Sequence, residues 1–343
     1  MTVKDQTGVA AYTGTEAWRG IQLAADEINS GDMLDGSKLE VEVKDTAGDV
    51  QTAASHVTQA AADSSVSAIL GPVLSDQALA VAPIAGKSEV PVVYTQAGSE
   101  GIVDEDWNFR ATPPLVTYYP KIGQYLEKQG ATSVNTVFAA DIPTLEQLSH
   151  DVLPSVGEDS GFQVGEQVAT QSTTQDYAGP VNKAIADDPD ALGLLMVGAQ
   201  ISSAMQAVIQ SGYQGEVVSY PNAAPAVAEI GKAAAGVTWP TNFDSSIDTP
   251  EVKAFDEAYT EAYDGTATNY AAEGYDSLMW VAKAIEEEGC ATRDAIKTGL
   301  EKVGQAGFTG TQGELTFEAN GHDARSDGYV VQWDGEKIVV LEQ

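Results

Sequence analysis

The residue types that support catalysis or metal binding occur in this chain of 343 residues, but not at the spacings that those chemistries require. The three histidines, His56, His150 and His322, lie far apart in the sequence and accompany no nucleophile signature such as GxSxG. The chain has no HExxH or GxGxxG segment, and its single cysteine, Cys290, cannot form a disulfide within the chain. We therefore assign no catalytic residue, no metal ligand and no cofactor, and we predict that the protein is not an enzyme.

Small polar residues instead follow several predicted strands. In open α/β sheets, ligands bind beyond the carboxyl ends of the strands, where backbone N–H groups of helix N-termini point outward. The residues of this kind are Ser75, Gln96, Ala97, Gly98, Ser99, Gln200, Tyr220 and Asn222. Ser75 has two interpretations: its hydroxyl caps the following helix, or it joins the adjacent amides in holding a carboxylate.

In the first half of the chain, predicted strands alternate with predicted helices. Apolar residues recur at helical spacing from Ala17 to Ile28. Leu39, Val41 and Val43 alternate with charged residues, as in a strand. The next predicted elements are helix 51–62, strand 67–70, helix 77–87 and strand 90–94. Short buried strands between helices of this length indicate a parallel sheet covered on both faces.

A second alternating set follows segment 111–114, whose two prolines cannot donate hydrogen bonds to a sheet. Its predicted elements are helix 118–129, strand 133–139, helix 144–158, strand 162–167, helix 177–186, strand 192–197, helix 202–211 and strand 216–219. We interpret 111–114 and 239–243 as crossings between two domains. Helices then begin near Pro250, Thr268 and Thr292, and strands 313–317, 329–333 and 337–341 end the chain. The predicted domains are 1–116 with 246–323, and 117–245 with 324–343.

The composition makes the protein strongly acidic. Lys and Arg number 17 against 51 Asp and Glu, so the formal net charge is -34 at pH 7. A surface of this charge repels phosphate backbones and anionic lipid headgroups. We therefore predict no nucleic-acid partner, and the sequence contains no apolar stretch suited to direct insertion into a membrane.

Several short segments occur in a specific order along nearly the whole chain. They are TG(x5)G(x5)G at Thr7, Gly8, Gly14 and Gly20, then LAADEIN, DTAGD, AILGPVLS, VPVV, NFRATPP, TTQDY, GYDS and FEANGH. In this order they resemble the type I periplasmic binding proteins that serve ABC importers of branched-chain amino acids and related compounds. The resemblance implies an α/β fold of two Rossmann-like lobes with parallel sheets, joined by three crossings, with a ligand cleft between the lobes.

The resemblance also suggests binding residues, with departures from the family pattern. The serine of the family's GPxxS segment, which binds the ligand carboxylate, corresponds to Ser75. Thr13, preceded by Tyr12, stands at the position of a usual tyrosine, and Gly98, beside Ser99, stands at that of a usual threonine. Each of these positions is expected to contact the ligand.

In the second lobe, the differences from the family pattern affect which charge the ligand can carry. Gln200 stands in place of a second tyrosine, and the acidic residue that pairs with an amino-acid ammonium is missing, because segment 219–222 reads Ser-Tyr-Pro-Asn. A buried ammonium without an anion costs several kcal/mol. We therefore predict a small carboxylate, amide or aromatic acid as ligand, while the resemblance still allows amino acids. Trp18 and Tyr118 are aromatic residues that either stack on such a ligand or belong to the core.

The function that the resemblance implies is solute binding. The protein would be the extracytoplasmic component of an ABC importer, in the periplasm or at the cell surface, and a lipid anchor would lie in a segment absent from this sequence. It would close around a small-molecule ligand by hinge motion and dock onto a membrane permease. The alternative is a ligand-sensing regulator or receptor domain of the same fold.

Overall fold

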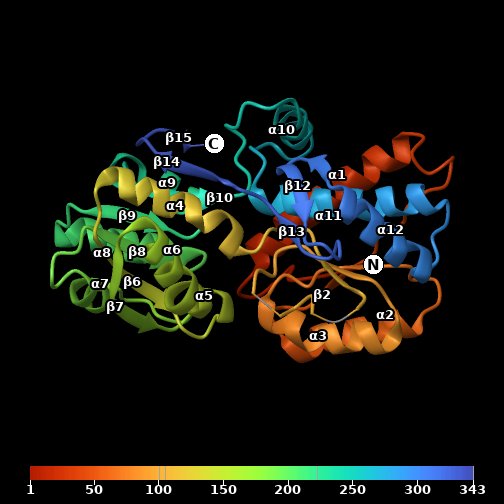
Figure 1. Ribbon diagram of the computed structural model, residues 1–343, viewed down its shortest axis with the longest axis horizontal. Coiled ribbons are helices and arrows are strands. Elements are labelled where there is room, and N and C mark those ends of the chain that lie inside the picture. The colour runs from red at the N-terminus through yellow and green to blue at the C-terminus, as the bar shows by residue number, and fades with distance from the viewer. Residues whose placement is uncertain (100, 105, 222, 343) are drawn as a thin grey trace. The chain divides into compact units, whose positions relative to one another are not determined.

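The chain folds into two compact units (Figure 1). The structure, a computed structural model, describes residues 1–99, 101–104, 106–221 and 223–342. Unit 1 consists of Met1–Pro114 and Phe243–Ser326, and unit 2 consists of Leu115–Asn242 and Asp327–Gln343. The chain therefore passes between the units three times, after residues 114, 242 and 326, where the sequence-based boundaries stand at 116, 245 and 323.

Unit 1 contains a parallel sheet with the strand order β2-β1-β3-β4-β5. Its strands are β1 (Thr2–Lys4), β2 (Val43–Asp45), β3 (Ile69–Leu70), β4 (Val92–Tyr94) and β5 (Asn108–Arg110). Because the strands are parallel, their carboxyl ends lie at one edge of the sheet. The predicted parallel sheet is confirmed for this unit.

The predicted strand from Leu39 is too long, because β2 begins only at Val43. Asn29 accounts for the difference: its side-chain oxygen accepts from Leu39 N at 2.8 Å and its side-chain nitrogen donates to Leu39 O at 2.9 Å. These bonds occupy the backbone groups that a strand would use for pairing. Leu39 instead packs against the core cluster that contains Ile21 and Trp280.

Helices cover both faces of this sheet. α1 (Ala11–Ser30), α11 (Asn269–Glu288) and α12 (Arg293–Ala306) form a core cluster with Leu70, Val93 and Phe109. α2 (Val50–Ala62) and α3 (Ser75–Ser88) pack beside each other against Val3, Ile69 and Tyr94 on the other face (Figure 1). A small antiparallel sheet of β11 (Phe308–Gly310), β12 (Gly313–Phe317) and β13 (Ala324–Arg325) completes the unit.

Two glycines of the sequence motifs permit the close packing of α1 on α11. A Cβ on Gly20 would lie 1.8 Å from Ala271 O, and one on Gly274 would lie 2.2 Å from Ala17 O. No other residue type fits at these positions without moving a helix backbone. Gly20 and Gly274 therefore act in helix packing.

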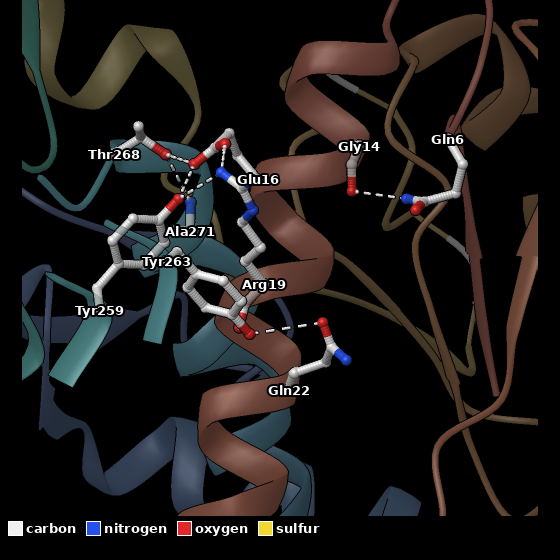
Figure 2. A network of polar contacts seen from close by, with 9 residues as sticks. All are labelled: Gln6, Gly14, Glu16, Arg19, Gln22, Tyr259, Tyr263, Thr268 and Ala271. Atoms are coloured by element: carbon white, nitrogen blue, oxygen red, sulfur yellow. Dashed lines mark hydrogen bonds and ion pairs between the residues drawn. The ribbon is translucent and has the colours of Figure 1, made fainter. Parts of the chain in front are cut away.

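A polar network joins α1 to α10 (Pro250–Tyr263) and to the start of α11 (Figure 2). The buried carboxylate of Glu16 accepts hydrogen bonds from Arg19 Nη1 at 2.7 Å, from Tyr259 OH, and from Thr268 Oγ1 at 3.2 Å. Thr268 Oγ1 in turn accepts from Ala271 N at 3.2 Å and caps α11. The network fixes the three helices relative to one another within unit 1.

Unit 2 contains a mixed sheet with the strand order β15-β14-β10-β9-β8-β6-β7. The parallel strands are β6 (Ser133–Ala139), β7 (Gln163–Thr170), β8 (Ala191–Leu195), β9 (Glu216–Ser219) and β10 (Thr238–Thr241). β14 (Tyr329–Trp333) and β15 (Ile338–Glu342) add antiparallel pairs. Most of segment 239–243, interpreted from the sequence as a crossing, therefore belongs to a strand, and the crossing itself follows Asn242.

The helices of unit 2 also form two layers. α4 (Leu115–Gln129), α5 (Pro143–Gln147), a π-helix (Leu148–Val152) and α6 (Leu153–Ser160) replace the predicted helices 118–129 and 144–158. α7 (Ala178–Ala184), α8 (Ala199–Ser211), α9 (Ala224–Ile230) and a 3₁₀ turn (Gly231–Ala234) lie on the opposite face. Within the described part of the chain, no helix is long and apolar enough to cross a bilayer.

Candidate functional site

The carboxyl edge of the unit 1 sheet brings Ser75 and Ser99 together. Ser75 begins α3 and is 6% exposed, and Ser99 follows β4 and is 5% exposed. Ser99 N donates a hydrogen bond to Ser75 Oγ at 3.2 Å, which connects the loops after β3 and β4. The interpretation of Ser75 as helix cap is wrong, because Leu74 occupies the N-cap position and makes no side-chain cap bond.

The N-terminus of α3 combines donors with one acid. Backbone N–H groups in a first helical turn and serine hydroxyls suit a carboxylate ligand. Asp76 lies in the same turn, and its Oδ1 accepts from Gln77 N at 2.7 Å. Burial, together with the negative charge of Asp5, raises the pKa of Asp76. This edge therefore offers hydroxyls and amides to a carboxylate, beside one acid whose pKa is raised.

The loop Thr95–Ser99 is held from both of its ends. Lys4, at the end of β1, is fully buried, and its Nζ donates to Thr95 Oγ1 at 2.6 Å and to Gln96 Oε1 at 3.4 Å. Arg110, at the end of β5, donates from Nη1 to Ser99 O at 2.6 Å. Ala97 is buried, whereas Gln96 and Gly98 are half-buried.

The two cations that hold this loop differ in their own partners. Arg110 donates from Nε and Nη2 to the two carboxylate oxygens of Asp323 at 2.6 and 2.7 Å, a bidentate pair that is almost fully buried. Burial lowers the pKa of Lys4 to about 7, although the charges of Asp5 and Glu273 act in the opposite direction. Arg110 therefore has an anionic partner of its own, while Lys4 titrates near neutral pH.

Asp5 is a second buried charge at the end of β1. Its Oδ1 accepts from Thr46 Oγ1 at 2.7 Å, from Gln77 Nε2 at 3.1 Å and from Gly48 N. Its Oδ2 is buried and makes no hydrogen bond to the residues that the structure describes. Lys4 and Asp5 were not predicted from the sequence; two charged residues at the end of a short apolar first strand are the signal that could have found them.

The three expected residues of α1 have different surroundings. Tyr12 is 47% exposed, and its ring lies edge-on to that of Tyr270 with centroids 6.2 Å apart. Thr13 is half-buried. Trp18 is also half-buried and packs against the core cluster that contains Ile21.

In unit 2, Gln200 and Tyr220 follow neighbouring parallel strands. Gln200 is the second residue of α8, and its Nε2 donates to Ser172 O. Its Oε1 is buried and accepts no hydrogen bond within the described ranges. Tyr220 follows β9, is half-buried and packs against both core clusters of the unit.

The other two expected residues of unit 2 give less information about a site. Tyr118 lies in the first turn of α4, is 5% exposed and has its ring centroid 5.8 Å from that of Tyr119. Asn222 lies outside the described residues.

An acidic residue that was not predicted from the sequence lies at the same edge of the unit 2 sheet. Asp141 is exposed and follows β6, and its Oδ1 accepts from Ser172 N at 2.7 Å. Since Ser172 O accepts from Gln200, these three residues link the ends of β6, β7 and β8. Its position two residues after a predicted strand is the signal that could have found Asp141.

The described residues contain no group of three or more His, Cys, Asp or Glu side chains that could hold a metal ion. Hydroxyls, amides and a few charged groups gather instead at the carboxyl edges of the two sheets. These groups can bind and orient a small polar molecule.

Comparisons with known proteins agree with a binding role. A model of the periplasmic binding protein family matches residues 2–337. The Leu/Ile/Val-binding protein homolog 7 of Brucella abortus (strain 2308) is 23% identical, over 98% of this chain and 88% of its own length. The chemotactic signal transduction system substrate-binding protein BasB of Halobacterium salinarum is 23% identical, over 87% of this chain and 72% of its own length.

Solved structures of similar fold include proteins with different ligands. The leucine-binding protein LivK of Thermotoga maritima is 25% identical with a TM-score of 0.88, and the match covers 99% of this chain and 96% of that one. A solute-binding protein of an ABC transporter from Rhodopseudomonas palustris BisB5, in complex with 3,4-dihydroxybenzoic acid, is 22% identical with a TM-score of 0.89. That match covers 99% of this chain and 95% of the other.

Proposed function

Because the chain belongs to the periplasmic binding protein family, with the two-lobed α/β fold that the sequence predicted, we propose that it binds a small carboxylate for an ABC importer. In this proposal it is an extracytoplasmic, non-enzymatic component that delivers the ligand to a membrane permease.

The observation that carries the proposal is the contact between Ser75 and Ser99 at the carboxyl edge of the unit 1 sheet. It places a serine hydroxyl at the start of a helix, beside a loop that two buried cations hold in place. A hydroxyl at a helix N-terminus stabilises an anionic group by a hydrogen bond and by the helix dipole. The carboxylate of the ligand is therefore assigned to unit 1.

The rest of the ligand is proposed to contact unit 2. Gln200 and Tyr220 offer an amide and a phenol to a neutral polar or aromatic group, consistent with the aromatic acid in one solved relative. Asp141 offers a carboxylate, which an amino-acid ammonium would require. The ligand class is therefore a small carboxylate, and Asp141 is the residue that would extend it to amino acids.

The proposed mechanism is hinge closure. Three chain segments join the units, and a ligand that contacts both units stabilises the closed form over the open one. The permease would recognise the closed form. Single-molecule fluorescence with one dye on each unit tests this step, since a ligand that binds without changing the dye separation contradicts it.

Calorimetric titration of the Ser75→Ala protein tests the assignment of the carboxylate. We expect the affinity for a binding carboxylate, identified from aromatic acids, aliphatic acids and amino acids, to fall about tenfold or more, because a hydrogen bond to a charged group contributes about 1.5–3 kcal/mol. Ser37→Ala is the matched control, since Ser37 is exposed in a loop of the same unit. Equal affinities of the two variants would refute the assignment.

A second candidate function is ligand sensing, because one relative is named as a substrate-binding protein of a chemotactic system. The binding step would be the same, and the partner would be a membrane signal transducer in place of a permease. Deletion of the gene distinguishes the two functions. Loss of uptake of the labelled ligand supports transport, and loss of taxis towards it with intact uptake supports sensing.

A further inference from the structure

We propose that Lys4 is a positioning residue for the ligand loop Thr95–Ser99, and that its buried positive charge makes the protein prefer anionic ligands. This inference rests on the proposed function and adds to it a residue that couples carboxylate binding to proton uptake.

The side chain of Lys4 lies between the two loops that form the carboxylate site. Its stem passes the turn after β3, since a Cβ built on Gly71 would lie 3.7 Å from Lys4 Cγ. Its ammonium then reaches the loop after β4, where it donates to Thr95 Oγ1 and Gln96 Oε1. Both acceptors are neutral, so these hydrogen bonds hold the loop without cancelling the positive charge.

The side chain of Gln96 connects Lys4 to helix α11 of unit 1. Its Oε1 accepts from Lys4, and its Nε2 donates to Tyr270 O at 3.3 Å in α11. Loss of the ammonium therefore removes both side-chain hydrogen bonds from β1 to the loop, while Thr95 Oγ1 still donates to Gln96 Oε1. Arg110 still holds the far end of the loop through Ser99 O.

The charged groups that face Lys4 come from two elements. Asp5 directly follows it after the end of β1, and Glu273 faces it from α11, where its Oε1 accepts from Thr112 Oγ1 at 2.9 Å. The turn at Gly71 and the loop at Thr95 present neutral groups to it. Burial outweighs the two carboxylates, so the pKa of Lys4 falls to about 7 and the amine is partly neutral at physiological pH.

An anion bound at this loop favours the protonated form of Lys4. Above about pH 7 the protein must then take up a proton when it binds a carboxylate, and the affinity falls by up to about tenfold for each pH unit. Below that pH the amine is already protonated, so no uptake and no pH dependence are expected from this residue.

Titration calorimetry of the whole chain tests the proposal directly. The probes are benzoate, 3,4-dihydroxybenzoate, leucine and isoleucine, at about pH 6 and about pH 8, each in two buffers of different ionisation enthalpy. The wild type is expected to take up a proton only at the higher pH. Lys4→Met is expected to bind about tenfold or more weakly at the lower pH and to take up no proton, and Lys4→Arg to restore binding without pH dependence. Lys87→Met, which removes an exposed charge from α3, is expected to match the wild type.

Two results would overturn the inference: no proton uptake by the wild type at about pH 8, or wild-type affinity and pH profile in Lys4→Met. If Lys4→Met does not fold, the wild-type measurement alone decides. If no probe binds, the proposed function fails, and hydrogen exchange of the amides from Thr95 to Ser99 still tests the positioning role. Their protection must fall in Lys4→Met relative to Lys87→Met, and equal protection would refute it.

Discussion

Unfolding of the protein at two pH values provides a quantitative test of the buried amine in unit 1. The pKa of Lys4 is about 7 in the folded chain and about 10.4 in an unfolded one. Between these values the unfolded state binds more protons, so the contribution of Lys4 to the free energy of unfolding rises with pH. Below about pH 7 both states are protonated, and this contribution is constant. Integration from pH 7 to pH 8.5 gives an increase of about 1.6 kcal/mol.

Urea unfolding of the wild type and of Lys4→Met measures this increase. Other groups titrate equally in the two proteins, so the difference between their free energies of unfolding isolates Lys4. Lys4→Met also removes two hydrogen bonds to the loop, so the two proteins are expected to differ in stability near pH 7. At pH 8.5 the free energy of unfolding of the wild type should be higher, relative to that of Lys4→Met, by about 1.6 kcal/mol more than at pH 7. A constant difference, or a shift in the other direction, would refute the reasoning.

Three further predictions concern packing and charge. Asp323→Asn leaves the buried guanidinium of Arg110 without its carboxylate, so the free energy of unfolding in urea should fall by about 3–5 kcal/mol. A decrease below about 1 kcal/mol would contradict a stabilising role of this ion pair. Gly274→Ala places a methyl group 2.2 Å from the Ala17 carbonyl oxygen. It should lower the free energy of unfolding by about 1–3 kcal/mol or more, and an unchanged melting temperature would show that the two helices can move apart without cost. Asp141→Asn should weaken the binding of leucine or isoleucine about tenfold while leaving benzoate unchanged, and calorimetry showing equal losses for both classes would argue against an ammonium contact.

Hydrophobic periodicity predicted the elements that bury one clear face. Strand 133–139 matches β6, and the helix expected at 51–62 begins one residue earlier as α2. The strand expected from Leu39 failed because a side chain distant in sequence, Asn29, occupies its backbone groups. A side-chain hydrogen bond of this kind has no periodic signature, and the same limit applies to β10, where Pro240 lies within a strand whose neighbours come from distant segments.

The sequence predicts only those residues of the candidate site that follow a predicted strand. Ser75 and Ser99 each follow a predicted strand, and parallel pairing brings them into contact. The roles of Lys4 and Asp5 depend on which face of β1 each side chain takes and on what covers it, and a three-residue strand carries too little pattern to show this. Gly14 illustrates the same point, since its absent Cβ would lie 1.9 Å from Asp5 O, a contact between segments that no spacing rule predicts.

The measurement that tests solute binding most directly is a thermal-shift screen of the purified protein against aromatic acids, aliphatic acids, amides and amino acids. A ligand that prefers the folded state, at about one hundred times its dissociation constant, adds about 2.7 kcal/mol of stability, which raises the melting temperature of a chain of this length by about 4 °C. We expect such a shift for at least one small carboxylate and not for its amide. Stabilisation by uncharged compounds alone, with no response to any carboxylate, would contradict it.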